Sequence, residues 1–458
     1  MLYGREKEID ALEERYNSGK FEFIPIFGRR RVGKTTLIQE FAKGKNAAYY
    51  CAVEGSLGEN VRGLAESLGV LTAGDAPLDS VLEIVRKKSE DERFLLIIDE
   101  YPELVKSSKG VGTKLRRFID SLGEDSKLFL ILTGSSLSLM KKEIVESTSA
   151  LYGRRTGSIR LEPLEYRHAR LLLDGFSEED RMRIYTMVGG IPWYLEHFNP
   201  GKSLQENIIR NFLGTTPLFE GEHTLVLISE FPTPKTYNKI LSALAGGNTR
   251  NTDIAKGAGI PAPMCSEYLD DLCEARIVEK RRPADNPSGK AVRYYIRDQY
   301  IQFHFAFIRP CMRTSIQPDL MKTANAVIKE IDRSVGRSFE EICAEHLNRC
   351  YGGESRTWWG GDPETGVQEE IDLIQTVDDE GVLRGYFTEC KYRNEKVGPA
   401  VLDNLVRKSH LVHGYDDVRY VLCSKSGFAN GFKERGVILL TYEEIAGIDT
   451  SEKQSEDR

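Results

Sequence analysis

Residues 28–35 read GRRRVGKT, and the prediction of the fold starts from this stretch. It follows an apolar run, FEFIPIF at 21–27, and it leads into TTLIQEFA at 35–42, which has helical character. A strand, a Gly-rich turn and a helix in this order fit the pattern G-x-x-x-x-G-K-[ST], in which backbone N–H groups and the helix N-terminus point at phosphate oxygens. The stretch therefore predicts a phosphate-binding loop, and a chance glycine-rich turn is the alternative interpretation.

Each position of this loop has an expected role. Gly28 and Gly33 allow the chain to wrap tightly, Lys34 reaches the β- and γ-phosphates, and the Thr35 hydroxyl completes the coordination of Mg²⁺. The expected cofactors are therefore ATP and Mg²⁺. The residues expected to contact the nucleotide are Gly28, Arg29, Arg30, Arg31, Val32, Gly33, Lys34, Thr35 and Thr36.

Two later apolar runs end in polar residues that suit the same site. FLLIIDE at 94–100 is expected to be a buried strand, with Asp99 holding Mg²⁺ through water and Glu100 polarising the attacking water. LFLILTGSS at 128–136 is a third strand, and Ser135 at its end can sense the γ-phosphate. Glu100 is thus the expected catalytic residue of ATP hydrolysis. A solvated acidic pair at a strand end is the alternative for the two carboxylates.

The composition fits a multidomain globular protein. The chain has 458 residues, of which 40% are hydrophobic and 29% are charged, so about three domains are expected. The longest apolar runs have five residues, whereas a bilayer needs about 20, so we expect no membrane partner. The first residues, MLYGREKEID, are charged and lack an apolar stretch followed by a small-residue cleavage site, so we expect no export signal. A net charge of −7 argues against wholesale coating of nucleic acid. The eight cysteines form no CxxC pair, which indicates reduced thiols in a cytoplasmic protein and makes a zinc site unlikely on pattern alone.

The middle of the chain predicts a winged helix-turn-helix. Its expected parts are a helix at 252–257, the turn AGIP and a recognition helix at 262–275, followed by a hairpin. The outward positions of the second helix are not basic, which makes direct base reading poor. Residues 276–297, however, hold seven basic and two acidic residues, enough for contacts with DNA phosphates. A solvated wing, or a module for protein contacts, is the alternative.

Spacing also singles out a group of charged residues near the C-terminus. Segments 369–375 and 387–392 are expected to form an antiparallel strand pair. Because side chains alternate along a strand, Asp372, Glu389 and Lys391 would then meet at one edge of the sheet. Two carboxylates and a backbone carbonyl suit Mg²⁺ or Mn²⁺, and the lysine can position a water and offset charge on a phosphodiester. A charged cross-strand cluster on an open sheet face is the alternative.

The first 210 residues or so resemble the archaeal-type ATPases of the AAA+ and STAND group. Besides the phosphate loop, the resemblance rests on YGREKEIDAL at 3–12, LYGRRTGSIRLEPL at 151–164 and GGIPWYLEHF at 189–198. It implies adenine contacts near Gly4, Arg5 and Glu6. It also implies an arginine finger, Arg154 or Arg155, which would face the phosphates of the same or a neighbouring subunit of a homo-oligomer. The third segment belongs by resemblance to a helical lid that often carries a sensor arginine, and none lies in it.

The C-terminal residues resemble the PD-(D/E)xK nuclease superfamily. GRSFEEICAEHL at 336–347 matches its leading helix, and RTWWG at 356–360 is typical of the domain that follows archaeal-type ATPases. Ile371 stands where the motif has proline, and Asn404 and Lys408 are expected to approach the site from the next helix. The resemblance implies a metal-dependent deoxyribonuclease with Asp372, Glu389 and Lys391 as catalytic residues. The metal ligands that it implies are Glu340, Asp372 and Glu389, beside Thr35 and Asp99 at the phosphate loop.

The expected fold is α/β, with a P-loop sheet followed by smaller modules. The expected domains are 1–160, P-loop ATPase core; 161–221, helical lid; 222–315, winged helix-turn-helix; 330–446, α+β restriction-nuclease-like domain; and 447–458, disordered tail. Two functions stay open. One is an ATP-hydrolysing enzyme that acts on DNA, and the other is a nucleotide-switched signalling or scaffold ATPase whose C-terminal domain binds DNA or protein without cleaving.

Overall fold

The computed structural model describes residues 2–71, 76–123, 125–311, 319–432 and 435–448, so most of the predicted tail lies outside the described residues. The chain divides into two compact units. The first consists of Met1–Leu164, Ile191–Tyr194 and Thr224–Pro234, and the second of Glu165–Gly190, Leu195–His223 and Lys235–Arg458.

A parallel sheet of five strands forms the centre of the first unit. In spatial order its strands are β2 (Ala47–Cys51), β3 (Phe94–Asp99), β4 (Leu128–Gly134), β1 (Glu22–Gly28) and β5 (Ile159–Leu161). The strands β1, β3 and β4 are buried along their whole length, as expected for a sheet with helices on both faces. The predicted parallel sheet is thus confirmed, and the carboxyl ends of these three strands meet at one edge.

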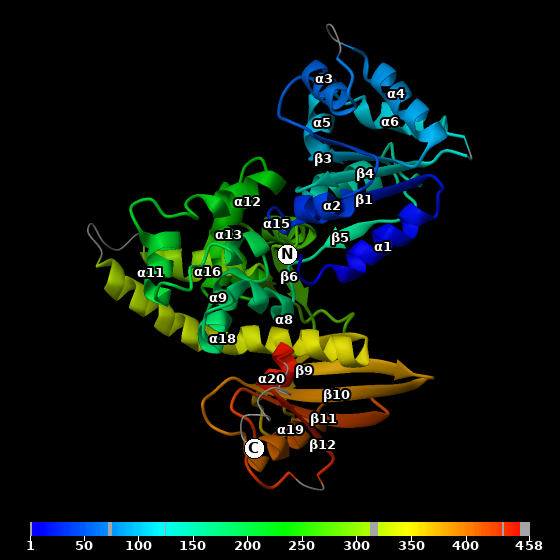
Figure 1. Ribbon diagram of the computed structural model, residues 1–458. Helices are drawn as coiled ribbons and strands as arrows, with labels where there is room; N and C mark the ends of the chain where they lie inside the picture. Colours follow the sequence, from blue (N-terminus) through cyan, green and yellow to red (C-terminus); the bar gives the residue numbers. More distant parts are fainter. Residues whose placement is uncertain (1, 72–75, 124, 312–318, 433–434, 449–458) are drawn as a thin grey trace, which may run out of the picture. The chain divides into compact units, whose positions relative to one another are not determined.

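Helices cover both faces of this sheet (Figure 1). The helices of this unit are α1 (Glu6–Asn17), α2 (Lys34–Ala42), α3 (Leu57–Ser67), α4 (Leu78–Asp91), α5 (Tyr101–Ser107), α6 (Val111–Asp120) and α7 (Leu137–Met140), together with parts of α10 (Pro192–Leu195) and α12 (Glu222–Glu230). Alternate residues of β4 show the two faces. Leu130 packs in the core with α3 to α6, whereas Phe129 contacts Phe41 of α2, with ring centroids 5.6 Å apart.

The second unit begins with helices and contains the predicted helix-turn-helix. Its helices before residue 312 are α8 (Tyr166–Ala169), α9 (Glu178–Val188), α11 (Leu204–Ile208), α13 (Lys235–Ala245), α14 (Asn251–Ala258), α15 (Ala262–Glu274), α16 (Gln299–Phe303) and α17 (Arg309–Cys311). Gly259, with φ of 66°, ends α14 in the left-handed conformation, and Pro261 precedes α15. The hairpin of β6 (Val278–Arg281) and β7 (Arg293–Ile296) follows, so the expected layout is confirmed.

A mixed α+β domain completes the second unit. Its sheet has the order β12 (Val437–Thr441), β11 (Asp417–Ser424), β10 (Val382–Lys391), β9 (Gln368–Asp379) and β8 (Glu354–Gly361). Strands β8, β9 and β10 are antiparallel neighbours, whereas β10, β11 and β12 run parallel. The helix α19 (Pro399–Ser409) lies between β10 and β11 in the chain, and α20 (Tyr442–Ala446) follows β12. The long helix α18 (Leu320–Tyr351), yellow in Figure 1, packs against the orange sheet.

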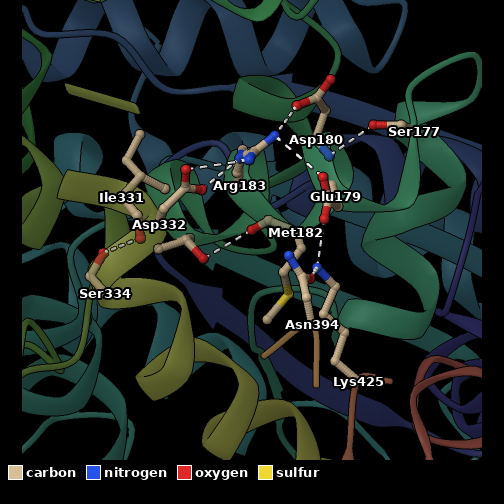
Figure 2. A network of polar contacts seen from close by, with 11 residues as sticks. Ser177, Glu179, Asp180, Met182, Arg183, Ile331, Asp332, Ser334, Asn394 and Lys425 are labelled. Atoms are coloured by element: carbon tan, nitrogen blue, oxygen red, sulfur yellow. Dashed lines mark hydrogen bonds and ion pairs between the residues drawn. The ribbon is translucent and has the colours of Figure 1, made fainter. Parts of the chain in front are cut away.

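A polar network connects α9 to this domain (Figure 2). The guanidinium of Arg183 donates to Asp332 of α18 at 2.7 Å and to Asp180 at 2.9 Å. Lys425, directly after β11, donates to Glu179 at 2.5 Å. Because these contacts join residues far apart in the sequence, they hold α9, α18 and the end of β11 in one arrangement.

Within the described part of the chain, we find no helix with the length and apolar character needed to cross a bilayer. All eight cysteines are free thiols.

Candidate nucleotide site and C-terminal carboxylate cluster

The phosphate loop joins β1 to α2 as the sequence predicts, and two of its positions require glycine. A Cβ added to Gly28 would lie 2.5 Å from the carbonyl oxygen of Leu161 on the neighbouring strand. Gly33 has φ of 98° and directly precedes α2. The first glycine thus allows close backbone approach, and the second allows a left-handed turn into the helix.

Lys34 lies buried at the start of α2 and connects the loop to β4. Its Nζ donates hydrogen bonds to the carbonyls of Gly28 at 2.8 Å and Arg29 at 3.2 Å, and to Oγ of Ser135 at 2.9 Å. Burial lowers the pKa of Lys34 to about 8, although the nearby carboxylate of Glu100 favours the charged form. The ammonium group of Lys34 is therefore largely shielded from water, and a phosphate bound beside it would interact with it strongly.

Asp99 collects three hydroxyl groups at the end of β3. The hydroxyls of Thr35 and Tyr49 donate to its Oδ2 at 2.9 and 2.7 Å, and that of Thr133 donates to Oδ1 at 2.9 Å. Asp99 and Thr35 are thus brought together as predicted, in a set of oxygen atoms that suits Mg²⁺. Tyr49 was not expected, and the exposed–buried alternation along β2 shows only that it lies on the opposite face of the sheet from Tyr50.

Glu100 and Ser135 form the third part of the site. Glu100 has φ of 50°, a conformation that costs free energy in a non-glycine residue. Its carboxylate accepts the N–H of Ser135 at 3.2 Å and also the Ser135 hydroxyl. A continuous path of hydrogen bonds therefore runs from Lys34 through Ser135 to Glu100.

Residues 191–194 lie against the phosphate loop, although the sequence assigned them to a lid without a sensor arginine. The guanidinium of Arg31 stacks 3.4 Å from the ring centroid of Trp193. Arg29 donates to the hydroxyl of Tyr194 at 3.3 Å. Aromatic side chains thus hold two loop arginines by stacking and hydrogen bonding, an arrangement that no sequence motif indicated.

Glu230 of α12 holds the segment that follows β4. Its carboxylate accepts the N–H groups of Leu137 at 2.8 Å and Ser138 at 3.1 Å, and the hydroxyls of Ser136 at 3.2 Å and Ser138 at 2.8 Å. No sequence motif indicated this residue, because it lies more than ninety positions from its partners.

The remaining predicted residues of the first unit lie at the margin of the Lys34–Asp99–Glu100 site or away from it. Val32 is buried, whereas Arg30 and Thr36 are exposed. Arg5 is buried and donates to the carbonyl of Val32 at 3.2 Å, which ties the N-terminal segment to the loop. In the described structure, Arg154 forms a two-pronged ion pair with Asp120 of α6, at 2.9 and 3.1 Å. Its role as a finger stays a prediction.

The second group of predicted residues gathers where the first half of β9 meets the end of β10. Oδ2 of Asp372 accepts the N–H of Cys390 at 2.8 Å. Nζ of Lys391 lies 2.7 Å from Oε1 of Glu389 and 3.7 Å from Oδ2 of Asp372. The expected antiparallel pairing, with Thr388 opposite Leu373, is confirmed and explains this meeting of charges.

Burial and mutual repulsion raise the pKa values of carboxyl groups in this cluster. Burial and the charge of Glu389 raise the pKa of Asp372 to about 6. Burial and the charge of Asp372 raise the pKa of Glu340 on α18 to about 8. Oε2 of Glu389 is buried and has no hydrogen-bond partner among the described residues. A divalent cation would relieve this repulsion, so the residues present fit Mg²⁺ or Mn²⁺.

Lys408 is the further charge at this cluster. Its buried Nζ donates to the carbonyl of Glu370 at 2.8 Å and lies 3.6 Å from Oε2 of Glu389. The expected approach of Lys408 to the carboxylates is therefore confirmed. The side chain of Asn404 instead accepts a hydrogen bond from Arg407 of the same helix at 3.0 Å.

Acidic residues from other elements partly compensate the basic hairpin. Arg281 lies 3.7 Å from Glu341 of α18, and Arg293 lies 3.7 Å from Glu370 of β9. Arg293 also stacks over Trp359, 4.5 Å from the ring centroid. Glu341 and Glu370 therefore compensate part of the positive charge counted along 276–297.

The parallel sheet, the loop built on Lys34 and the Asp99–Thr35 pair define a P-loop NTPase domain. Comparison with protein families agrees: an ATPase domain predominantly from Archaea matches residues 2–198. The arsR family of bacterial regulatory proteins matches 235–280, and archaeal and bacterial proteins of unknown function match 304–401.

A protein of Methanocaldococcus jannaschii, itself uncharacterized, is 30% identical over 430 residues, which cover 91% of this chain and 93% of that protein. The chain therefore belongs to the same family as this methanogen protein. An uncharacterized ATP-binding protein of the same organism is 41% identical over 54 residues, 11% of this chain and 92% of that protein. The Walker-type ATPase PABY2304 of Pyrococcus abyssi shares the fold, with a TM-score of 0.50 and 21% identity over 66% of this chain and 96% of that one.

Proposed function

We propose that this protein is an ATP-hydrolysing enzyme that acts on DNA, in which the nucleotide state of the first unit governs a metal-dependent nuclease site in the second. The observation that carries the ATPase part is the hydrogen-bonded path from Lys34 through Ser135 to Glu100. The path brings a buried ammonium, a hydroxyl and a carboxylate to one sheet edge, and this supports binding of the phosphates by the ammonium and activation of water by the carboxylate.

The residues of the first unit would divide the work of hydrolysis. Lys34 binds the β- and γ-phosphates, and the N–H groups that precede α2 complete the cradle. Thr35 and Asp99 would hold Mg²⁺, which supplies charge neutralisation on the phosphates when bound. Glu100 orients the attacking water and accepts its proton, while Ser135 keeps the carboxylate directed at this position.

A nucleotide-binding assay tests this part of the proposal. Lys34→Ala should lower the affinity for ATP by about 100-fold or more, because a buried charge-assisted contact to phosphate is lost. The matched control is Lys43→Ala, which removes an exposed lysine at the end of the same helix, paired with Glu40. Unchanged ATP affinity in Lys34→Ala would mean that the phosphate loop has another role.

The proposed nuclease site rests on the cluster of Asp372, Glu389 and Lys391. The two carboxylates and Glu340 would hold Mg²⁺ or Mn²⁺, which activates a water and binds a phosphate oxygen when present. Lys391 positions that water and offsets the charge that develops on the phosphodiester. The buried Oε2 of Glu389 without a hydrogen-bond partner among the described residues supports a metal ligand at this atom.

A cleavage assay tests the nuclease part. The purified protein is incubated with Mn²⁺ and with single-stranded, duplex and branched DNA, in the presence and absence of ATP. Asp372→Asn should abolish cleavage, whereas Glu354→Gln, which changes an exposed carboxylate of β8 paired with Arg356, should keep it. If the wild type degrades no more DNA than Asp372→Asn, the nuclease proposal fails.

DNA contact is proposed for the helix-turn-helix and its hairpin. Lys280 and Lys290 are exposed there and can reach phosphates. Lys290→Ala should weaken DNA binding about equally for all sequences. It should also reduce the slope of log affinity against log salt concentration by about one, the value for one lost phosphate contact. Binding without any salt dependence would contradict phosphate contact.

The second candidate is a nucleotide-switched scaffold that binds without cleaving. One observation favours it: Lys391 and Lys408 already neutralise the carboxylates, with Nζ atoms 2.7 and 3.6 Å from the two oxygens of Glu389. In this case Mn²⁺ would not bind at Asp372, and ATP would change the assembly state of the protein. Calorimetric titration with Mn²⁺ and light scattering with and without ATP distinguish the two functions.

A further inference from the structure

Three cysteines from separate parts of the chain meet in the interior of the C-terminal domain. Cys343 lies on α18, Cys390 on β10 and Cys423 on β11, and all three are buried. Their sulfur atoms all lie within 4.8 Å of one another. No sequence pattern indicated this cluster, because 33 or more positions separate its members and no CxxC spacing is present.

The geometry suits a single metal ion. Metal–sulfur bonds of about 2.3 Å hold three sulfur atoms about 4 Å apart around one ion in a trigonal plane. The observed limit of 4.8 Å needs only small side-chain adjustments to reach this value. Each cysteine lies on a different element, so no two ligands depend on the same backbone segment.

Thiolates are soft ligands, which favours Cu⁺, Zn²⁺ or iron–sulfur clusters over hard cations. Structural zinc is almost always bound by four ligands, and iron–sulfur clusters are held by four cysteines as a rule. Among the described residues this group contains three ligands. We propose that Cys343, Cys390 and Cys423 form a binding site for one Cu⁺ ion.

Binding is an exchange of protons for metal without a change of oxidation state. Each ligating thiol releases its proton to solvent as the sulfur–copper bond forms. The product carries a net negative charge, whose burial costs free energy, so strong copper–sulfur bonds must supply the affinity. Entry also requires a local opening between α18 and the sheet, and binding is therefore expected to be slow.

The site is separate from the proposed nuclease cluster but shares a strand with it. Cys390 stands between Glu389 and Lys391, and because side chains alternate along β10 it faces the opposite side of the sheet. Copper would thus join α18, β10 and β11 behind the carboxylates and stabilise this arrangement.

The test uses the full chain, reduced and kept without oxygen, with the exposed Cys51 and Cys350 replaced by serine. Cu⁺ is offered from a coloured chelator, and its transfer is followed by the chelator absorbance and by sulfur-to-copper charge-transfer absorption. We expect one Cu⁺ per chain. Cys423→Ala should lower the affinity by roughly 100-fold or more, whereas Cys265→Ala, which changes a buried cysteine outside the cluster, should not.

X-ray absorption at the copper edge provides a measurement that needs no cluster variant, in case Cys423→Ala folds poorly. Three sulfur neighbours at one distance would support the site. Failure to remove Cu⁺ from the chelator, or equal uptake by Cys423→Ala, would overturn the proposal. A parallel titration with Zn²⁺ decides the metal, because tight Zn²⁺ binding without Cu⁺ uptake would also overturn it.

Discussion

The hydroxyl of Tyr49 donates a hydrogen bond of 2.7 Å to Oδ2 of Asp99, the same oxygen that accepts the hydroxyl of Thr35 at 2.9 Å. Tyr49 comes from β2, outside the segments that define the nucleotide site in the sequence. Because its hydroxyl contacts the proposed Mg²⁺ residue, we propose that Tyr49 positions the Asp99 carboxylate.

Tyr49→Phe should raise the Mg²⁺ concentration needed for half-maximal ATPase activity by about 10-fold, since a residue that orients a metal-binding carboxylate is lost. Affinity for ATP without metal should stay unchanged. The control is Tyr50→Phe, because the Tyr50 hydroxyl donates instead to Asn60 at 2.8 Å on the other side of β2. If both variants show the same Mg²⁺ requirement as the wild type, Tyr49 has no positioning role.

Glu100→Gln should separate binding from hydrolysis. The amide keeps the size of the side chain and can still accept the Ser135 N–H, but it cannot take a proton from water. We expect the rate of ATP hydrolysis to fall about 100-fold or more, with ATP affinity within about twofold of the wild type. Glu103→Gln, which changes a carboxylate of α5 paired with Lys106, is the control. A fully active Glu100→Gln would assign the proton transfer to another group.

Sequence reasoning succeeded where the chemistry is local. The loop at 28–35 is contiguous, and the strands that carry Asp99 and Ser135 are apolar runs with a polar residue at the end. The meeting of Asp372 with Glu389 followed from alternation along two neighbouring strands, so one pairing assumption was sufficient.

The residues that sequence reasoning missed reach the sites from distant segments. Tyr49 stands 50 positions from Asp99, and Trp193 stacks on Arg31 from the other end of the unit. Glu230 lies about ninety positions from the loop that it holds. No local pattern encodes such contacts, because they depend on the three-dimensional path of the chain.

Lys408→Met should destabilise the second unit. The substitution keeps much of the volume but leaves Glu389 and Asp372 with less positive charge in a buried place. We expect the free energy of unfolding to fall by about 2–4 kcal/mol, as when one partner of a buried ion pair is removed. Mn²⁺ should restore part of this loss if the carboxylates bind metal, because a ligand that binds only the folded state stabilises it.

Chemical denaturation with and without Mn²⁺ measures both effects. Lys396→Met, which removes an exposed lysine before α19, serves as the control and should change neither value. The charge balance proposed for this cluster would be contradicted if Lys408→Met had the same free energy of unfolding as the wild type. It would also be contradicted if Mn²⁺ did not reduce the loss of free energy of unfolding in this variant.

Glu345 of α18 should make the stability of the second unit depend on pH. Its carboxylate accepts the N–H of Tyr166 at 3.0 Å and the hydroxyl of Tyr185 at 3.2 Å. Burial raises its pKa from 4.5 to about 8. The folded state therefore holds a proton that the unfolded state releases as the pH rises above 4.5, so this group reduces stability progressively up to about pH 8.

Glu345→Gln removes this pH dependence, because the amide stays neutral and its oxygen can still accept both hydrogen bonds. Near pH 4.5 the variant and the wild type should be about equally stable. Near pH 8 the variant should be more stable by at most about 4–5 kcal/mol, since each tenfold change in the protonation equilibrium between pH 4.5 and about 8 corresponds to about 1.4 kcal/mol. Melting temperatures at the two pH values measure the difference, with Glu330→Gln, an exposed carboxylate of the same helix, as control. A difference between variant and wild type that does not grow with pH would mean that Glu345 is ionised in the folded protein.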